Sequence, residues 1–298
     1  MRQSYLKQTP LGKLFDGINM FLMLILIFIM VYPFWNQLVH SLNEGRDAAR
    51  GGLYFWPRVP TFDNYVYMMT RGDLGRGAVI SVLRVLVGTV TSIFFSGLIA
   101  YVTTIRWFSG RRIIRFVFLI TMYFSGGLIP TYLWYIRLGL INSFAVYWIP
   151  GLINAYFLLL IAAYIFNLPE ALTESARIDG SGELRIYISI VAPLCIPVFA
   201  AVAVFGAVGH WNSWFDVMVF NPSGRWDTLQ MHLRRILLDV EQIQKLQSEA
   251  AQREALRTLT PGSVRAATTM IVTLPIIFAY PFLQRYFISG ISIGAIKG

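Results

Sequence analysis

The stretch ESARIDGSGELRIYISIVAPLCIP, from Glu174 to Pro197, lies between two of the most apolar parts of the chain. It gathers two glutamates, one aspartate, two arginines and two glycines into a short interval. A simple connection between two apolar segments does not need this many charges. The stretch therefore predicts a structured projection that has a function of its own.

The chain around this stretch has the composition of a membrane protein. Of its 298 residues, 56% are hydrophobic and 13% are charged, whereas soluble domains have roughly 25% charged residues. Six apolar runs are long enough to cross about 30 Å of hydrocarbon as helices. We therefore predict an all-α polytopic membrane protein with six transmembrane helices, at Gly17–Val39, Gly77–Thr104, Ile114–Ile136, Phe144–Phe166, Ala192–Phe215 and Ala266–Ile288.

Basic residues near the ends of the runs predict the orientation. The segment before the first run is basic, and the loop after the second run contains no acid but four arginines: Arg106, Arg111, Arg112 and Arg115. We expect both in the cytoplasm. Residues 1–16, the loop 167–191 and the tail 289–298 are then cytoplasmic, the loops 40–76 and 218–265 are external, and residues 17–288 form the transmembrane domain. The first run has a spanning length and no signal-like cleavage site, so we expect it to be retained.

Two short helices are predicted in and before the quoted stretch. Asn167 and Glu170 have the spacing of a capping box, which predicts a helix start there. Glu170, Thr173, Glu174 and Arg177 follow helical spacing and share one charged face. On periodicity alone, an ordinary amphipathic surface loop is the alternative.

The end of this first helix has its own signal. Gly180 is placed to take a left-handed conformation that stops the helix, and Ser181 is placed to cap a second helix. The sequence therefore predicts a helix, a turn and a second helix.

These residues also resemble a known family. ESARIDG, followed by Ile190 and Pro193, is similar to the E-A-A-x-x-x-G-x9-I-x-L-P signature of ABC importer permeases, and in particular to the second permease of maltose-type heterodimers. The departures are Ser175 in place of alanine and Ala192 in place of leucine. GHWNSWFD (Gly209–Asp216) and GISIGAIKG (Gly290–Gly298) resemble two further segments of the same family.

The resemblance implies a fold, partners and a mechanism. The fold is that of a type I ABC importer permease in the bacterial inner membrane, surrounded by lipid. The partners are a second homologous permease, a cytoplasmic ATPase dimer that holds ATP and Mg, and an external solute-binding protein that delivers an oligosaccharide. No cofactor is expected on this chain. The projection would be a coupling helix that docks on the ATPase through its charged face, and the residues so assigned are Glu170, Glu174, Ser175, Ala176, Arg177, Asp179 and Gly180.

A sugar path needs aromatic faces and hydrogen-bonding groups inside the membrane. Trp211 and Trp214 are three residues apart, and His210 and Trp214 are four apart, which predicts an aromatic and polar strip on one helix face. Interfacial anchoring is the alternative role for such aromatic residues. The path candidates are Arg84, Tyr123, Asn154, Tyr156, His210, Trp211, Asn212 and Trp214.

Arg84 interrupts an apolar run and would be costly facing lipid. If it lines the path, it favours an acidic, uronate-like substrate. The alternative is a snorkelling or interhelical structural arginine. Three interruptions of the runs are predicted bending points: SGGLIP (Ser125–Pro130), IPG (Ile149–Gly151) and the pair Pro193 and Pro197.

Other functional classes fit less well. A secondary transporter usually has intramembrane carboxylates, and no Asp or Glu lies within the six runs. A membrane enzyme would need a catalytic or metal-binding constellation, but the three histidines lie far apart in sequence and Cys195 is the only cysteine. The basic residues are scattered, which does not favour nucleic acid. No phosphate-binding G-x-x-x-x-G-K-[ST] motif occurs, so ATP hydrolysis would require another polypeptide.

The external loop 218–265 contains a segment rich in helix formers, from Leu238 to Leu259. Glu241 and Lys245 are spaced i, i+4, as are Glu249 and Arg253, which predicts helix. The segment is either a solvated connector or a docking site for the solute-binding protein.

Overall fold

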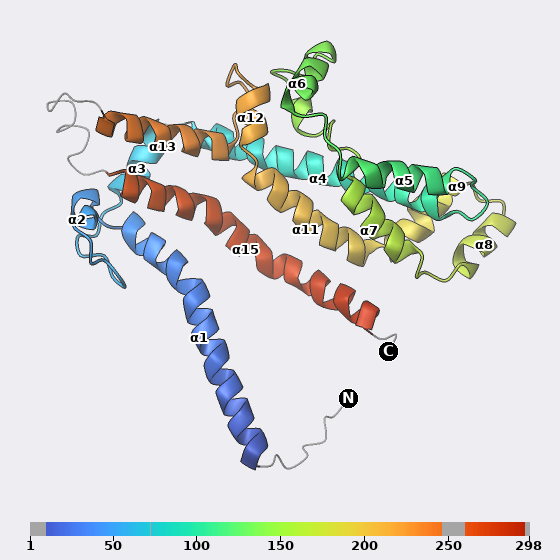
Figure 1. The fold of residues 1–298 in the computed structure, drawn as a ribbon, viewed down its shortest axis with the longest axis horizontal. Coiled ribbons are helices and arrows are strands. Elements are labelled where there is room, and N and C mark those ends of the chain that lie inside the picture. The colour runs from blue at the N-terminus through green and yellow to red at the C-terminus, as the bar shows by residue number, and fades with distance from the viewer. Residues whose placement is uncertain (1–9, 72, 246–259, 296–298) are drawn as a thin grey trace. The chain divides into compact units, whose positions relative to one another are not determined.

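The computed structural model describes residues 10–71, 73–245 and 260–295 (Figure 1). These residues are mostly helical. Among them there is no β-strand, and an isolated bridge joins Asn43 to Pro60. The predicted all-α class is therefore confirmed for the part of the chain that the structure describes.

The chain divides into two compact units. The first comprises Met1–Gly72 with Arg235–Thr273, and the second comprises Asp73–Arg234 with Leu274–Gly298. Three helices lie wholly in the first unit: α1 (Pro10–Ser41), α2 (Gly45–Ala49) and α3 (Asp63–Arg71). Two helices contribute residues to both units: α13 (Leu229–Lys245) and α15 (Pro261–Ala295).

A polar cluster orders the loop that follows α1 in the first unit. The Asn43 side chain donates to Asp47 Oδ2 at 3.0 Å and accepts from the backbone N–H of Val59 at 2.8 Å. Arg58 Nε donates to the same Asp47 oxygen at 2.9 Å. The hydrogen bond from Asn43 and the charge of Arg58 hold the pKa of Asp47 below its usual value. The loop is therefore folded on itself.

In the second unit, α4 packs against α7 and α11 (Figure 1). Their contacts form an apolar core whose fully buried members include Ala100, Leu158, Ile161 and Val202. The helices of this unit are α4 (Leu74–Thr104), α5 (Arg111–Thr121), α6 (Leu128–Arg137), a 3₁₀ turn (Phe144–Tyr147), α7 (Ala155–Ile165), α8 (Ala171–Ile178), α9 (Glu183–Ile186), a π-helical segment (Tyr187–Val191), α10 (Ala192–Leu194), α11 (Ile196–Asn212) and α12 (Phe215–Phe220).

Within the described residues, three helices are long and apolar enough to cross a membrane: Pro10–Ser41, Leu74–Thr104 and Pro261–Ala279. A fourth crossing arises if Glu183–Leu194 and Ile196–Asn212, which meet at an angle of 81°, form one broken span. The predicted runs at Gly17–Val39, Gly77–Thr104 and Ala266–Ile288 fall inside continuous helices.

Three of the predicted runs are not continuous helices, and that part of the prediction is wrong. Ala192–Phe215 is divided among α10, α11 and the start of α12. Ile114–Ile136 is divided between α5 and α6 by residues 122–127, the last of which, Gly127, takes a positive φ of 83°. Phe144–Phe166 contains only a 3₁₀ turn and α7, which has 11 residues and so spans about 17 Å. The breaks coincide with SGGLIP and IPG, and the 81° bend lies between Pro193 and Pro197. The helices are therefore interrupted at all three predicted positions.

Candidate functional site

The start of α8 differs from the expected capping box. Glu170 occupies the N-cap position, but no side chain caps the helix. The amide of Asn167 instead donates to the carbonyl oxygen of Ala163 at 2.8 Å, at the end of α7. The carboxylate of Glu170 pairs with Arg106 at 2.6 Å. The capping box is therefore wrong, because both side chains have other partners.

The end of α8 is as predicted. Gly180 has a φ of +78°. Its N–H donates to the carbonyl of Arg177, and the N–H of Ser181 donates to the carbonyl of Ala176, both at 3.0 Å. This pair of bonds is a Schellman motif, in which a glycine takes the left-handed position. The predicted cap of the next helix is wrong, because α9 begins at Glu183 and its N-cap is Gly182.

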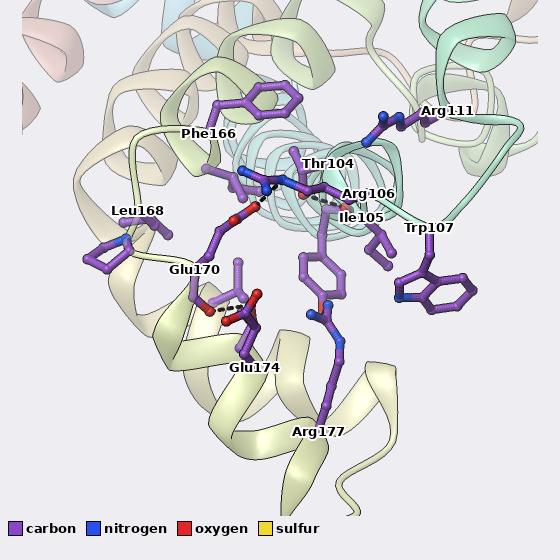
Figure 2. A pocket seen from close by; sticks show the side chains of 15 residues that line it. Thr104, Ile105, Arg106, Trp107, Arg111, Phe166, Leu168, Glu170, Glu174 and Arg177 are labelled. Atoms are coloured by element: carbon purple, nitrogen blue, oxygen red, sulfur yellow. Dashed lines mark hydrogen bonds and ion pairs between the residues drawn. The ribbon is translucent and has the colours of Figure 1, made fainter.

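The two faces of α8 have different surroundings. Its charged face lines a cleft of about 610 Å³, together with the end of α4 and the loop that follows it (Figure 2). Glu170, Glu174 and Arg177 all border this cleft, and Ala176 is buried. The residues on the outer face are Leu172, Ser175, Ile178 and Asp179, of which Ile178 is 87% exposed. The outer face is thus exposed to a partner, and Glu174 on the charged face is exposed as well.

Arg177 forms the most enclosed contact of the cleft. Its Nε donates to Glu183 Oε1 at 2.7 Å, and this hydrogen bond raises the pKa of Arg177 above its usual value. Tyr101 on α4 donates to the other oxygen of Glu183. Tyr101 was not predicted as part of this site, because no local signal at a tyrosine near the end of an apolar run indicates a partner 82 residues away.

Arg84 forms an interhelical ion pair, and its part in a sugar path stays a prediction. Its guanidinium pairs with Asp216 at the start of α12, its side chain is only 4% exposed, and it lies 4.6 Å from the centre of the Tyr147 ring. Asp216 also accepts from the hydroxyl of Ser213 at 2.7 Å and from the N–H of Val217 at 2.9 Å. The positive charge of Arg84 is therefore already matched, and it gives no support to an acidic substrate.

The predicted strip from His210 to Trp214 does not form. α11 ends at Asn212, and Ser213 has an extended backbone, so Trp214 begins a separate helix. Trp214 lies under the guanidinium of Arg234, whose Cζ is 3.6 Å from the ring centre. The helical spacing across Ser213 therefore does not apply.

The individual members of this cluster have distinct neighbours. The His210 ring lies against Gly88, where an added Cβ would be 2.4 Å from Nε2. Trp211 borders an apolar pocket of about 230 Å³ formed with residues of α4 and α15. Asn212 Oδ1 accepts from the amide of Gln230 at 3.4 Å.

The other path candidates lie on separate elements. Asn154 caps α7 by accepting from the N–H of Phe157 at 3.1 Å. Tyr123, just beyond α5, is 78% exposed, and Tyr156 on α7 is 49% exposed. Their part in a sugar path stays a prediction. Within the described ranges, no group of three or more His, Cys, Asp or Glu side chains is placed to hold a metal ion.

Comparison with known proteins identifies the family. No family model matches the chain. It is 33% identical to protein LplC of Bacillus subtilis over 97% of both chains. It is 32% identical to the polygalacturonan/rhamnogalacturonan transport system permease protein YtcP of the same organism, over 96% of this chain and 99% of YtcP.

A solved structure of a sugar transporter is also similar to this chain. The crystal structure of a bacterial ABC transporter involved in the import of the acidic polysaccharide alginate contains a chain with a TM-score of 0.81 and 25% identity, covering 96% of this chain and 100% of that one. The chain belongs to the permease subunits of ABC sugar-transport systems. This permease is therefore an integral membrane protein with a role in transport, as the resemblance at ESARIDG implied.

Proposed function

We propose that this permease is one half of the translocation path of an ATP-driven oligosaccharide importer in the bacterial inner membrane. A second, homologous permease supplies the other half, and an external solute-binding protein delivers the sugar. ATP and Mg bind to a cytoplasmic ATPase dimer, where hydrolysis takes place, and the chain itself carries no cofactor. The observation that supports this most directly is α8, which ends in a Schellman motif at Gly180 and presents an open outer face.

For the topology, we propose six crossings with both termini in the cytoplasm, as the distribution of basic residues indicates. In this arrangement the crossings near Ile114–Ile136 and Phe144–Phe166 are broken ones. The loops 40–76 and 218–265 are external, whereas 1–16, 167–191 and 289–298 are cytoplasmic. The ordered cluster around Asp47 then faces the outside, and α8 faces the ATPase.

For the substrate class, we propose an acidic oligosaccharide built from uronic acids. The support comes from two relatives, one described as a polygalacturonan/rhamnogalacturonan permease and the other as an importer of alginate. Arg84 contributes nothing to this proposal, because Asp216 neutralises it.

For ATPase docking, we propose that the outer face of α8, around Ser175, Ile178 and Asp179, is the contact surface. An exposed isoleucine flanked by small and polar residues can enter an apolar groove on a partner and bury its side chain there. The charged face is turned toward the cleft and holds α8 on the rest of the permease.

Reconstitution tests the function. The two permeases and the ATPase are purified together and placed in proteoliposomes, and uptake of a labelled trigalacturonate is measured with loaded binding protein. Maltotriose, a neutral trisaccharide of the same length, is the matched control. We expect uptake of trigalacturonate only with hydrolysable ATP. Uptake by the permeases without any ATPase chain would replace the proposal with an ion-coupled secondary transporter, and equal uptake of maltotriose would remove the acidic substrate class.

A further inference from the structure

Three polar side chains from three different helices meet beside α8. The hydroxyl of Tyr101 on α4 donates to Glu183 Oε2 at 2.5 Å, and Arg177 Nε on α8 donates to Glu183 Oε1 at 2.7 Å. Arg177 Nη2 also donates to the Tyr101 oxygen at 3.4 Å. The three groups thus form a closed ring of hydrogen bonds that joins α4, α8 and α9.

The burial of these groups makes the ring stronger than an ordinary surface ion pair. Tyr101 is 2% exposed, and the side chains of Arg177 and Glu183 are 30% and 33% exposed. Hydrogen bonds with charged partners are among the stronger ones in proteins, and partial removal of water strengthens them further. The neighbouring pair of Arg106 and Glu170 is 77% and 48% exposed and is expected to contribute little.

A second contact joins α4 to Tyr187, the first residue after α9. The rings of Tyr101 and Tyr187 stack with their centres 5.7 Å apart, and the Tyr187 hydroxyl donates to the carbonyl of Phe94 at 3.2 Å. That hydroxyl fits over Gly97, where an added Cβ would lie 2.5 Å from it. Two successive tyrosine contacts therefore fix the segment after α8 to the end of α4.

The backbone from Tyr187 onward departs from regular α-helix. Tyr187 begins a π-helical turn that extends to Val191, and the chain bends by 81° between Leu194 and Ile196. π-helical turns are often found at functional sites. A displacement of α8 is therefore expected to move the end of α4 with it, while the bend after Leu194 absorbs the change of direction.

We propose that Tyr101, Arg177 and Glu183 are positioning residues that clamp α8 to α4, so that movement of the ATPase is transmitted to α4 directly. This inference rests on the proposed function. Coupling here means that ATP hydrolysis and sugar uptake proceed in a fixed ratio. Loss of the clamp lets α8 move without α4, so that less sugar is taken up for each ATP hydrolysed.

The test uses Tyr101→Phe in the full complex, because this change removes the hydroxyl and keeps the ring that stacks on Tyr187. We expect the complex to assemble and binding-protein-stimulated ATP hydrolysis to continue, while the sugar taken up per ATP falls at least about threefold. Glu183→Gln should give a similar fall, and the double variant should add little to either single one. Arg106→Gln, which removes the exposed pair with Glu170, is the matched control and should leave the ratio unchanged.

The possible outcomes are distinct. A role confined to stability would lower the yield or thermal stability of the complex without changing sugar per ATP, and that result would overturn the clamp. An unchanged ratio in both Tyr101→Phe and Glu183→Gln would do the same. Failure of the proposed function would appear differently, because the wild-type complex itself would then show no ATP-dependent uptake.

Discussion

Arg84 on α4 and Asp216 at the start of α12 form an ion pair across 132 residues of sequence. The two side chains differ in how much solvent and how many other hydrogen bonds compensate their charge when the partner is removed. Asp216 is 27% exposed and keeps hydrogen bonds from Ser213 and Val217, whereas the Arg84 side chain is 4% exposed. An unmatched charge costs more the more deeply it is buried.

We therefore predict that Asp216→Asn destabilises the complex more than Arg84→Met. The first change leaves a buried guanidinium without a counter-charge, which costs about 3–5 kcal/mol. The second leaves a carboxylate that water and Ser213 still solvate. The measurement is the temperature at which the purified complex dissociates, for both single variants and the double variant. A larger effect of Arg84→Met would contradict this account of the pair.

The contact between Gly88 on α4 and His210 on α11 gives a second prediction. A Cβ on residue 88 would lie 2.4 Å from His210 Nε2, so Gly88→Ala should force the helices apart and cost about 1–3 kcal/mol. His210→Ala in the same chain should restore much of the loss. Gly75→Ala on α4 is the control, because nothing lies within 4 Å of that position. If the double variant is no more stable than Gly88→Ala alone, the two residues do not share this contact.

Gly180 gives a third prediction, which concerns backbone conformation alone. No atom lies within 4 Å of an added Cβ, but the φ of +78° is unfavourable for a β-branched residue. Gly180→Val should cost about 1–2 kcal/mol locally and lower both substrate-stimulated ATP hydrolysis and uptake. Gly180→Asn should retain more activity, since asparagine tolerates this conformation.

Gly182→Ala is the matched control for Gly180. Residue 182 has a φ of −69°, which any residue can adopt, and it also has no neighbour within 4 Å. We expect normal transport from this variant. Normal transport from Gly180→Val as well would show that the turn after α8 does not depend on its left-handed residue.

Local features of the fold were predictable from the sequence. The stop at Gly180 and the bends at SGGLIP, IPG and the two prolines depend on glycine and proline, whose backbone preferences act at their own positions. The long apolar runs predicted α1, α4 and α15, because hydrophobicity over about 20 residues is itself a local signal.

The pairing of distant side chains was not predictable in the same way. Nothing near Arg84 indicates Asp216, and nothing near Tyr101 indicates Glu183, because each pair forms only when helices far apart in sequence pack together. Helical spacing also failed across Ser213, where an extended backbone ends α11 inside an apolar and aromatic segment. The orientation of the charged face of α8 toward the cleft likewise depends on tertiary packing.

The loop after α13, which we propose to be external, gives a fourth prediction. α13 continues to Lys245, and the rest of the expected helical segment, residues 246–259, lies outside the described residues. We expect deletion of Gln242–Arg253 to reduce the stimulation of ATP hydrolysis by loaded binding protein, with basal hydrolysis and assembly unchanged. Glu241→Ala, which removes only the 3.0 Å pair with Arg265, is the control. Full stimulation of the deletion variant across a titration would leave the loop as a connector.

The outer face of α8 gives the last prediction. Ile178 is 87% exposed, so its replacement should not disturb the permease itself. If its side chain enters the ATPase, burial contributes roughly 1.5–3 kcal/mol, and Ile178→Glu should weaken retention of the ATPase by about 10-fold or more. The sequence alone placed Glu174 at this interface, but in the structure Glu174 borders the cleft. Glu174→Lys should therefore weaken retention less than Ile178→Glu does. The measurement is the amount of ATPase retained on the immobilised permease complex over a range of ATPase concentrations, and the reverse order would place the docking surface on the charged face of α8.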